Sequence, residues 1–376
     1  MQKAFEDLIQ RQRNWLFGLP PSERLDPLLR LRMSPQEAQL LVRIPHLPVT
    51  ADQLSRELGM GEADLQGQLD ALARKGLVME FAGSKATRYA LADAFFQFYR
   101  MPGYAGANDA TNRAISPLLN AYYREAMAES VLKLRTRGLR AIPVGKSVRD
   151  TREIRPFEDV ALIIEKAASI SVSTCACRHR KNLDPNEPSC KHETETCMHL
   201  DKLSQQLVRH GIGRQISKQE ALKIAEAAAD AGLIHGVSNM KSGIDTICSC
   251  CSCCCAFLES KAVLKEGFPG HQPSNYIAAK DEAKCTLCGL CVKRCPVSAM
   301  ALVDEGTACA GTAEGGRELP KKRIAYHPEK CIGCGVCARK CPGDALALKA
   351  RVTEADIPDS PMAFVQRVLS EQKAKM

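Results

Sequence analysis

Cysteine is distributed very unevenly along this 376-residue chain, and that distribution constrains the fold more than any other feature of the sequence. None of the 19 cysteines precedes Cys175, and the last of them is Cys341. An odd number does not suit a complete set of disulfides, and spaced cysteines in a reducing compartment usually bind metals. The sequence therefore predicts a cysteine-free half followed by a half that is organised around metal ligation.

Length and composition exclude several classes of protein. The chain is long enough for two or three domains, and its content of 45% hydrophobic and 25% charged residues is ordinary for a globular protein. No run of about 18 uncharged apolar residues occurs, so we expect no membrane insertion. The first residues include Lys3, Glu6 and Asp7 and lack the apolar segment of a secretory signal. We therefore expect a cytoplasmic protein with reduced thiols.

Two copies of one cysteine motif stand 46 residues apart in the last third of the sequence. The first reads CTLCGLCVKRCP from Cys285 to Pro296, and the second reads CIGCGVCARKCP from Cys331 to Pro342. In each motif, cysteines at positions i, i+3 and i+6 can hold three corners of one iron–sulfur cube, while the fourth begins a helix and points to the other cube. Zinc sites normally use paired C-x₂-C units, so this spacing favours iron–sulfur clusters over zinc.

These motifs make residues 276–350 resemble the bacterial two-cluster [4Fe–4S] ferredoxins. The resemblance implies two [4Fe–4S] clusters that pass single electrons, and the region supplies no acid, base or nucleophile for catalysis. It implies that one cluster is held by Cys285, Cys288, Cys291 and Cys341. It implies that the other cluster is held by Cys331, Cys334, Cys337 and Cys295. Cys309, which stands between the motifs in a Gly- and Ala-rich segment, is expected to be a spare thiol.

Ten further cysteines stand in the middle of the chain, in segments that we expect to be loops flanked by helices. They are Cys175, Cys177, Cys190, Cys197, Cys248, Cys250, Cys251, Cys253, Cys254 and Cys255. Their density predicts at least one further metal centre held by a subset of them. The sequence leaves open what these cysteines form: one or two more iron–sulfur clusters, one cluster plus a redox-active thiol pair, a zinc site, or plain disulfides. His179, His192 and His199 are expected to have polar surface roles rather than ligand roles.

The layout as a whole is similar to a family of ferredoxin-like proteins in which a C-x-C-R segment and a CC-x-CCC run precede a C-terminal dicluster module. In this chain those segments are Cys175–Arg178 and Cys250–Cys255. The resemblance implies a cluster-binding middle domain and indicates no substrate.

Residues 34–95 predict three helices followed by a β-hairpin. Ser34 and Thr50 begin the first two helices as capping boxes, and residues 62–75 form the third. This order resembles winged helix-turn-helix regulators, which implies DNA as a partner. Residues 34–100, however, carry a net charge of −1, and contacts to phosphates require cations. DNA binding is therefore the less favoured interpretation, and docking onto a partner or formation of a homodimer is favoured.

A basic strip covers residues 133–155 and carries a net charge of +6. Its basic residues are Lys133, Arg135, Arg137, Arg140, Lys146, Arg149, Arg152 and Arg155. The strip predicts either a docking surface for an acidic redox partner or a nucleic-acid contact, with an ordinary solvated face as the alternative. It contains no aromatic residue, so stacking on bases is not expected.

These patterns predict an α+β protein with a winged helix-turn-helix domain, a helical Cys-rich middle domain and a dicluster ferredoxin-like domain. The expected divisions are a helical lead (1–33), a winged-helix-like domain (34–100), a helical and basic connector (101–156), a Cys-rich metal-binding domain (157–275), a ferredoxin domain (276–350) and a tail (351–376). The predicted function is electron transfer to redox partner proteins, rather than stand-alone catalysis. The alternatives are a redox- or iron-responsive regulator that binds DNA and a subunit of a thiol/disulfide oxidoreductase. No nucleotide- or flavin-binding fingerprint occurs.

Overall fold

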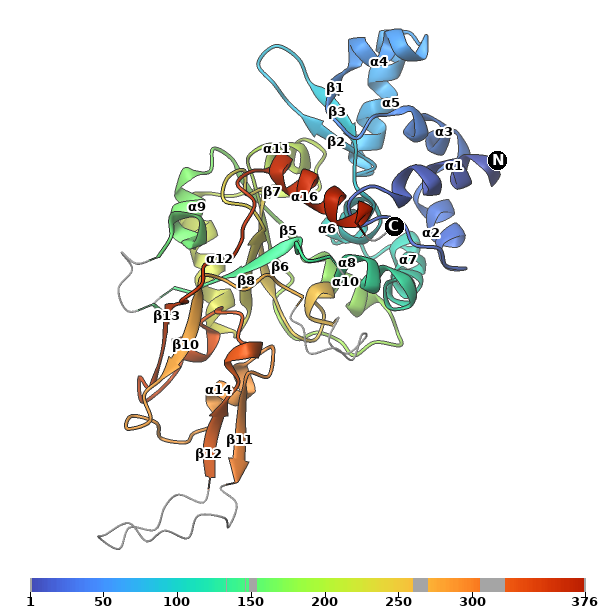
Figure 1. Cartoon of the computed structure of the whole chain (residues 1–376). Coiled ribbons are helices and arrows are strands. Elements are labelled where there is room, and N and C mark those ends of the chain that lie inside the picture. The colour runs from blue at the N-terminus through green and yellow to red at the C-terminus, as the bar shows by residue number, and fades with distance from the viewer. Residues whose placement is uncertain are drawn as a thin grey trace, which may run out of the picture.

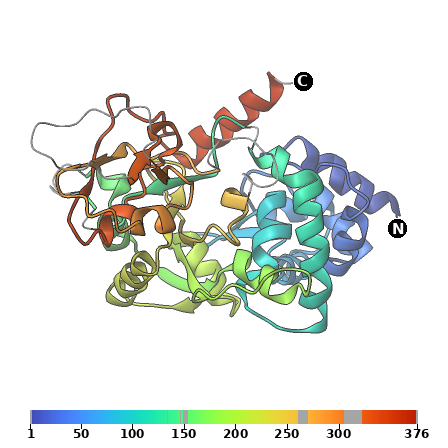
Figure 2. The ribbon, with the colours of Figure 1, turned by 90° about the horizontal axis from the view of Figure 1, so that it is seen from below.

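The computed structural model describes residues 2–132, 134–145, 147–148, 154–259, 270–304 and 322–374. Helices and strands are mixed throughout, as the α+β prediction requires. The N-terminal helices and the C-terminal cysteine-motif module lie at opposite ends of the molecule, with a six-stranded sheet between them (Figure 1). A view from below shows the same order (Figure 2). Within the described residues, no helix is long and apolar enough to cross a membrane.

The N-terminal part consists of five helices and a small sheet. The helices are α1 (Gln2–Arg13), α2 (Leu25–Arg32), α3 (Pro35–Arg43), α4 (Ala51–Leu58) and α5 (Glu62–Arg74). The strands β1 (Val49–Thr50), β2 (Val78–Phe81) and β3 (Arg88–Leu91) pair antiparallel in the order β1-β3-β2. The three helices and the hairpin predicted for residues 34–95 are therefore confirmed, and their assignment to winged helix-turn-helix proteins stays a prediction.

Local sequence signals begin and end these helices. The Ser34 side chain accepts a hydrogen bond from Glu37 N, and the Glu37 carboxylate accepts one from Ser34 N, which is the predicted capping box. Thr50 makes the same reciprocal bonds at the start of α4. That helix ends at Gly59, whose φ of 66° suits a residue without a Cβ.

The hairpin of the N-terminal part packs against the middle domain. Gln206 donates from Nε2 to Val78 O at 3.0 Å and accepts from Glu80 N at 3.1 Å. The buried Glu80 carboxylate also pairs with Arg209 and lies 2.9 Å from His210 Nε2. The hairpin is therefore an internal contact between two parts of the same chain.

A succession of helices leads from the hairpin to the middle domain. They are the π-helix η1 (Phe95–Arg100), α6 (Met101–Tyr104), α7 (Ala110–Tyr122), the π-helix η2 (Tyr123–Met127) and α8 (Ala128–Leu132). In η1, the rings of Phe95 and Tyr99 stack with their centroids 4.7 Å apart. The ring centroids of Tyr99 and of Tyr123 in η2 are 5.2 Å apart. π-Helices are rare and often occur at functional sites. The aromatic face of η1 lines a cysteine-rich pocket described below.

The middle domain is built on a six-stranded antiparallel sheet with the strand order β4-β8-β9-β6-β5-β7. The strands are β4 (Leu139–Ile142), β5 (Ile170–Thr174), β6 (Glu195–Leu200), β7 (Arg214–Gln215), β8 (Ile234–Ser238) and β9 (Thr246–Cys250). The accompanying helices are the 3₁₀-helix η4 (Pro156–Glu158), α9 (Val160–Lys166), α10 (Ala176–Leu183), α11 (Asp201–Arg209) and α12 (Lys218–Asp230).

The prediction of a helical middle domain is therefore wrong. The strands are short and mix Cys, Ser and His with β-branched residues, and β8 is buried along its whole length, so no alternation of polar and apolar residues marks it. The expectation that the cysteines occupy loops is also wrong for four of them. Cys197 lies on β6, Cys248 and Cys250 lie on β9, and Cys177 lies in α10.

The basic strip is not a continuous solvated face. Arg140 lies on β4, is fully buried, and pairs through Nη1 with Glu158 Oε1 at 2.9 Å. Arg137 is buried as well, and Arg155 pairs with Glu354. The prediction of a docking surface is therefore wrong for Arg137 and Arg140, because both residues are buried where the chain enters strand β4. The basic residues Lys133, Lys146, Arg149 and Arg152 lie outside the described residues.

The C-terminal module consists of two antiparallel strand pairs, each of which joins a strand beside the first cysteine motif to a strand beside the second. β10 (Tyr276–Lys280) pairs with β13 (Leu346–Ala350), and β11 (Met300–Asp304) pairs with β12 (Lys322–Tyr326). The short helices α14 (Leu290–Arg294) and α15 (Val336–Arg339) lie within the two motifs, and the 3₁₀-helix η5 (Pro328–Lys330) precedes the second. The internal repeat of the sequence thus becomes a repeated structural unit.

The C-terminal helix α16 (Pro361–Lys373) connects the end of the chain to earlier segments. Its Glu371 carboxylate accepts hydrogen bonds from Thr136 N at 3.1 Å and from Thr136 Oγ1 at 2.6 Å. Phe364 and Val368 on the same helix are buried. Residues after the ferredoxin-like module therefore contribute to the packing of the whole chain.

Candidate metal centres

The first cysteine triplet and the last cysteine of the second motif lie around one pocket. That pocket is lined by Cys285, Cys288, Cys291, Cys337 and Cys341. The structure therefore brings together the four residues that the ferredoxin resemblance implies for one cluster. Thiolates converging on one cavity suit the chemistry of an iron–sulfur cube, whose irons take thiolate ligands.

The second triplet lies around Cys295 of the first motif. Burial raises the pKa of Cys334 to about 12, with a further contribution from the nearby thiols of Cys295 and Cys331. Burial and the same neighbours raise the pKa of Cys337 as well. Crowded buried thiols resist ionisation unless a bound cation offsets their charge, which a metal cluster does. The other implied ligand set is thus also brought together.

Backbone N–H groups contact the fourth cysteine of each motif in the same way. Ala299 N donates to Cys295 Sγ at 3.1 Å, and Ala345 N donates to Cys341 Sγ at 3.3 Å. Hydrogen bonds to ligand sulfurs are one means by which a protein sets the reduction potential of a cluster. The repeat therefore extends from the cysteines to their hydrogen-bond donors.

The two triplets differ in their access to solvent. Cys288 of the first triplet is exposed, whereas Cys334 of the second is only 8% exposed. The carbonyl of Cys334 accepts a hydrogen bond from Val144 N at 2.9 Å, which attaches the second triplet to the segment that follows β4. The first site thus faces solvent, and the second faces the protein interior.

Seven of the ten middle cysteines line another pocket. Six of them form what we name the cysteine chamber, namely Cys175, Cys177, Cys197, Cys248, Cys250 and Cys255, and the seventh is Cys251. They come from α10 and its N-cap, from strands β6 and β9, and from the turn that follows β9. Pairing of the two strands, with Met198 opposite Ile247, brings Cys197 and Cys248 within hydrogen-bond reach. The chamber is therefore assembled from segments that are far apart in the sequence.

The thiols of the chamber form one continuous series, in which each thiol is close enough to the next to shift its pKa. In spatial order the residues are Cys175, Cys177, Cys255, Cys250, Cys248 and Cys197. The hydrogen bond between the first two raises the pKa of Cys175 and lowers the pKa of Cys177. The pKa of Cys197 is raised and that of Cys248 is lowered by the bond between them. Protons shared in this way are readily replaced by a soft metal or an iron–sulfur cluster.

Three arginines place positive charge around the chamber. Arg100 lines it, and although burial opposes its charge, nearby phenol and thiol groups, Cys248 among them, raise its pKa. Arg178 is fully buried and donates to Thr196 Oγ1 at 2.7 Å. Arg180 is 3% exposed. An iron–sulfur cube with four thiolates is an anion, and buried cations stabilise it.

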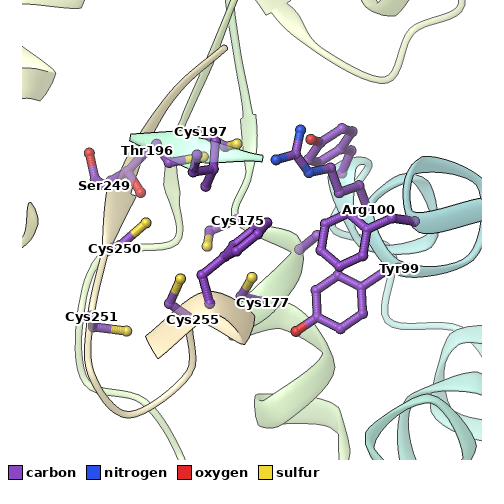
Figure 3. A pocket seen from close by; sticks show the side chains of 16 residues that line it. Tyr99, Arg100, Cys175, Cys177, Thr196, Cys197, Ser249, Cys250, Cys251 and Cys255 are labelled. Carbon is purple, nitrogen blue, oxygen red and sulfur yellow. The ribbon is translucent and has the colours of Figure 1, made fainter. Parts of the chain in front are cut away.

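Aromatic rings line the chamber together with its cysteines. They include Phe95, Tyr99, Tyr104 and Phe257, and Figure 3 shows Tyr99 across the chamber from Cys250. The buried hydroxyls of Tyr99 and Tyr104 have no hydrogen-bond partner among the described residues. Buried polar groups in proteins are normally satisfied, so these hydroxyls indicate that a bound group completes the chamber.

A histidine that the sequence analysis did not single out lies next to the chamber. His271 is fully buried, and one of its ring nitrogens lies within 4.8 Å of the sulfurs of Cys250 and Cys255. Neither ring nitrogen has a hydrogen-bond partner among the described residues, and burial lowers the pKa of His271 to about 4. The ring is therefore neutral, which is the form that binds metals. His271 stands between the cysteine-rich segments in sequence but belongs to no motif that would identify it.

The predicted surface roles of the other histidines are wrong for two of the three. His179 is buried and hydrogen-bonded through Nε2 to Ala107 O at 3.0 Å. His199 is buried on β6, and its Nε2 lies 2.7 Å from Ser173 Oγ. His192 is half-buried. The strand and helix that carry the cysteines also take His179 and His199 into the interior, where they bond to protein groups.

The remaining four middle cysteines form a separate group. The sulfurs of Cys190, Cys251, Cys253 and Cys254 all lie within 4.8 Å of one another. Cys251 also borders the cysteine chamber. The structure thus divides the ten cysteines into six and four, a division that the sequence left open. Cys309 lies outside the described residues.

Comparison with known proteins assigns the C-terminal part of the chain. The family model of the 4Fe-4S dicluster domain matches residues 277–342, which contain both cysteine motifs. Neither the curated proteins nor the solved structures gave a match. The match and the converging cysteines together identify residues 277–342 as a ferredoxin-like domain that binds iron–sulfur clusters.

Proposed function

We propose that this protein is an iron–sulfur electron-transfer protein in which two [4Fe–4S] clusters exchange electrons with a third centre in the cysteine chamber. The first cluster is held by Cys285, Cys288, Cys291 and Cys341. The second cluster is held by Cys331, Cys334, Cys337 and Cys295. The proposal is supported by the dicluster match, by the pocket that Cys341 lines together with the first triplet, and by the paired N–H···S hydrogen bonds.

One observation carries the proposed direction of the relay. Cys334 of the second triplet belongs to the same hydrophobic core as Cys250 and Cys255 of the chamber. Exposure decreases from Cys288 at the surface to Cys334 and then to the buried Cys255, which is 4% exposed. We infer that a redox partner exchanges electrons at the first cluster, that the second cluster passes them inward, and that the chamber centre receives them away from water.

The third centre is proposed to be an iron–sulfur cluster. Such a cluster supplies single-electron redox chemistry when bound, and its potential depends on charge, hydrogen bonds and burial. The six chamber thiols and His271 are more ligands than one cube requires. Because consecutive thiols of the series lie close together, the ligands of one cube would be members of the set that are not neighbours in the series. Arg100, Arg178 and Arg180 offset the negative charge of the cube. The aromatic rings of η1 exclude water from the same side. The chain's own residues therefore bind, neutralise and enclose the centre.

Iron and sulfide analysis of the whole chain, purified without oxygen, tests this proposal. We expect about 12 irons per chain, of which about eight belong to the ferredoxin-like domain and about four to the chamber. Low-temperature EPR after stepwise reduction should resolve a third signal that titrates separately. A content of about eight irons, with no third signal, would contradict a cluster in the chamber.

The N-terminal part is proposed to dock within the molecule rather than to bind DNA. Its hairpin is occupied by Gln206 and Arg209 of the middle domain. The exposed start of α5 carries Glu62 and Asp64, which would repel phosphates. The start of α5 therefore presents acidic side chains where DNA binding requires cations.

A DNA titration checks this interpretation. Fluorescence anisotropy of a labelled mixed-sequence duplex, measured with the anaerobic holo-protein, should give at most non-specific binding with Kd above about 10⁻⁶ M at physiological salt. The weak complex should dissociate as salt rises from about 50 to about 200 mM. A complex that survives the higher salt and discriminates between duplex sequences would instead support the redox- or iron-responsive regulator.

A further inference from the structure

Four of the middle cysteines have a geometry that differs from the cysteine chamber. Cys190 Sγ lies 3.7 Å from Cys253 Sγ and 4.0 Å from Cys251 Sγ, and Cys253 Sγ lies 3.6 Å from Cys254 Sγ. All four sulfurs lie within 4.8 Å of one another. The group is thus a compact cage of four soft ligands.

The sulfur–sulfur distances indicate how many metal ions the cage fits. A tetrahedral zinc ion with Zn–S bonds of about 2.3 Å has its four sulfurs about 3.8 Å apart. The three distances between 3.6 and 4.0 Å match that edge length. The four thiolates of a [4Fe–4S] cube are bound to four different irons, so their sulfurs stand much farther apart. The cage therefore fits one metal ion and is too small for a cube.

The packing of this cage differs in part from that of the chamber. Cys251 and Cys254 pack with Ala228 and Leu233 in a small hydrophobic cluster, against which Cys190 and the chamber residue Cys177 also lie. Cys250 and Cys255, which flank the same turn, belong to the main core instead. The turn after β9 therefore directs three of its sulfurs to one side and the flanking two to the other.

Hydrogen bonds within the fold hold the fourth ligand in place. Cys190 lies in the loop after α10, and its backbone N–H donates to Asn182 Oδ1 at 2.8 Å. Asp184 at the start of that loop accepts from Asn186 N at 2.9 Å and from Asn120 Nδ2 at 2.7 Å. Because these bonds already order the loop, it loses less conformational entropy when Cys190 binds a metal ion, which favours metal binding.

Charge at the cage also suits a divalent ion. Four thiolates and one divalent cation carry a net charge of −2, and the buried Arg178 guanidinium lies close enough to Cys251 to favour its thiolate form. Four cysteine ligands leave no position open for water or substrate, so such a site is structural rather than catalytic. Cys253 is the exposed ligand, which places the cage at the surface of the molecule.

We propose that Cys190, Cys251, Cys253 and Cys254 bind one tetrahedral divalent ion of the zinc class. The ion joins the loop after α10 to the turn after β9. Because Cys250 and Cys255 flank that turn, the ion also sets the positions of two ligands of the cysteine chamber. The site is thus a structural support for the redox centre, separate from the path of the electrons.

Metal analysis of the anaerobically purified full chain, from cells supplied with both iron and zinc, tests the proposal. The wild-type protein should contain about one zinc per chain in addition to its iron. Cys190→Ser should lose most of the zinc and keep the irons of the two ferredoxin clusters. Cys309→Ser is the matched control, because Cys309 lies outside both motifs and outside the middle group of cysteines. This variant should keep both metals.

X-ray absorption at the zinc edge tests the wild-type chain without relying on any variant to fold. Iron–sulfur clusters do not interfere, because the edge is specific for the element. The expected result is a shell of four sulfurs at about 2.3 Å. Nitrogen or oxygen neighbours in place of sulfur would overturn the four-cysteine assignment.

Two other outcomes would also overturn the proposal. A wild-type content of about 16 irons without zinc, reduced by about four in Cys190→Ser, would mean that the cage holds a further cube. A metal-free cage with a Cys253–Cys254 disulfide, detected by mass spectrometry, would mean a redox-active thiol pair. Neither outcome affects the irons of the ferredoxin-like domain, so failure of this proposal is distinguishable from failure of the relay.

Discussion

Cys334→Ser is expected to remove about four irons per chain and to cut the electron path between the surface and the cysteine chamber. Cys334 is a buried ligand of the proposed second cluster, and its carbonyl is bonded to Val144 N at 2.9 Å at the junction with the middle domain. Iron and sulfide analysis measures the loss. Stopped-flow reduction by a protein-sized reductant should show that the first cluster is reduced at its normal rate, while the chamber centre is reduced far more slowly.

A matched variant at the other triplet makes this test specific. Cys288→Ser should also lose about four irons, but it should keep the signal of the second cluster. Cys295→Ser should resemble Cys334→Ser rather than Cys288→Ser, although Cys295 stands in the same motif as Cys288, because its sulfur lies beside the second triplet. If Cys295→Ser instead removed the same signal as Cys288→Ser, the proposed exchange of ligands between the motifs would be wrong.

Cys255→Ala is expected to abolish the third centre and to leave both ferredoxin clusters intact. Cys255 is 4% exposed and is hydrogen-bonded to both Cys177 and Cys250, so it lies in the middle of the series of chamber sulfurs. Its removal should lower the iron content from about 12 to about 8 per chain. EPR of the reduced variant should lose the third signal and retain the signals of the dicluster domain.

The control for this variant is Ser252→Ala, which changes an exposed residue in the same turn without removing a thiol. It should keep all of the iron, and both variants should keep the zinc bound by the Cys190 group. Retention of about 12 irons in Cys255→Ala would show that Cys255 is not a required ligand and would favour the other chamber thiols or His271. Loss of about eight irons or more would point to general unfolding, which circular dichroism identifies independently.

Features that depend on neighbours in the sequence were predicted well. The spacing of the motifs that begin at Cys285 and Cys331 was sufficient to identify the iron–sulfur region, which the dicluster family model matches. The capping boxes at Ser34 and Thr50 placed the starts of α3 and α4 correctly. In each case the relevant hydrogen bonds or ligands lie within a few residues, so a linear pattern contains the information.

Features that depend on strand pairing were not predicted. The sheet of the middle domain joins β6 to β9 and β4 to β8, pairs of strands that are far apart in the sequence. The sequence pattern placed Arg140 in a basic strip, whereas in the structure Arg140 is buried on strand β4 and pairs with Glu158. His271 has no recognisable motif and is brought to Cys250 and Cys255 only by folding. Register across a sheet is set by packing, which a single sequence does not display.

The sequence by itself determined that this chain binds metal through its cysteine-rich half and that two repeated motifs carry iron–sulfur chemistry. Ligand type and local spacing are sufficient for that conclusion, because soft thiolates at fixed intervals select the metal group. Only the tertiary structure decided how the ten middle cysteines divide. The run from Cys248 to Cys255 supplies three sulfurs to the buried chamber, from Cys248, Cys250 and Cys255, and three to the compact cage, from Cys251, Cys253 and Cys254. Strand β9 and the turn that follows it point these two sets of side chains to different sides.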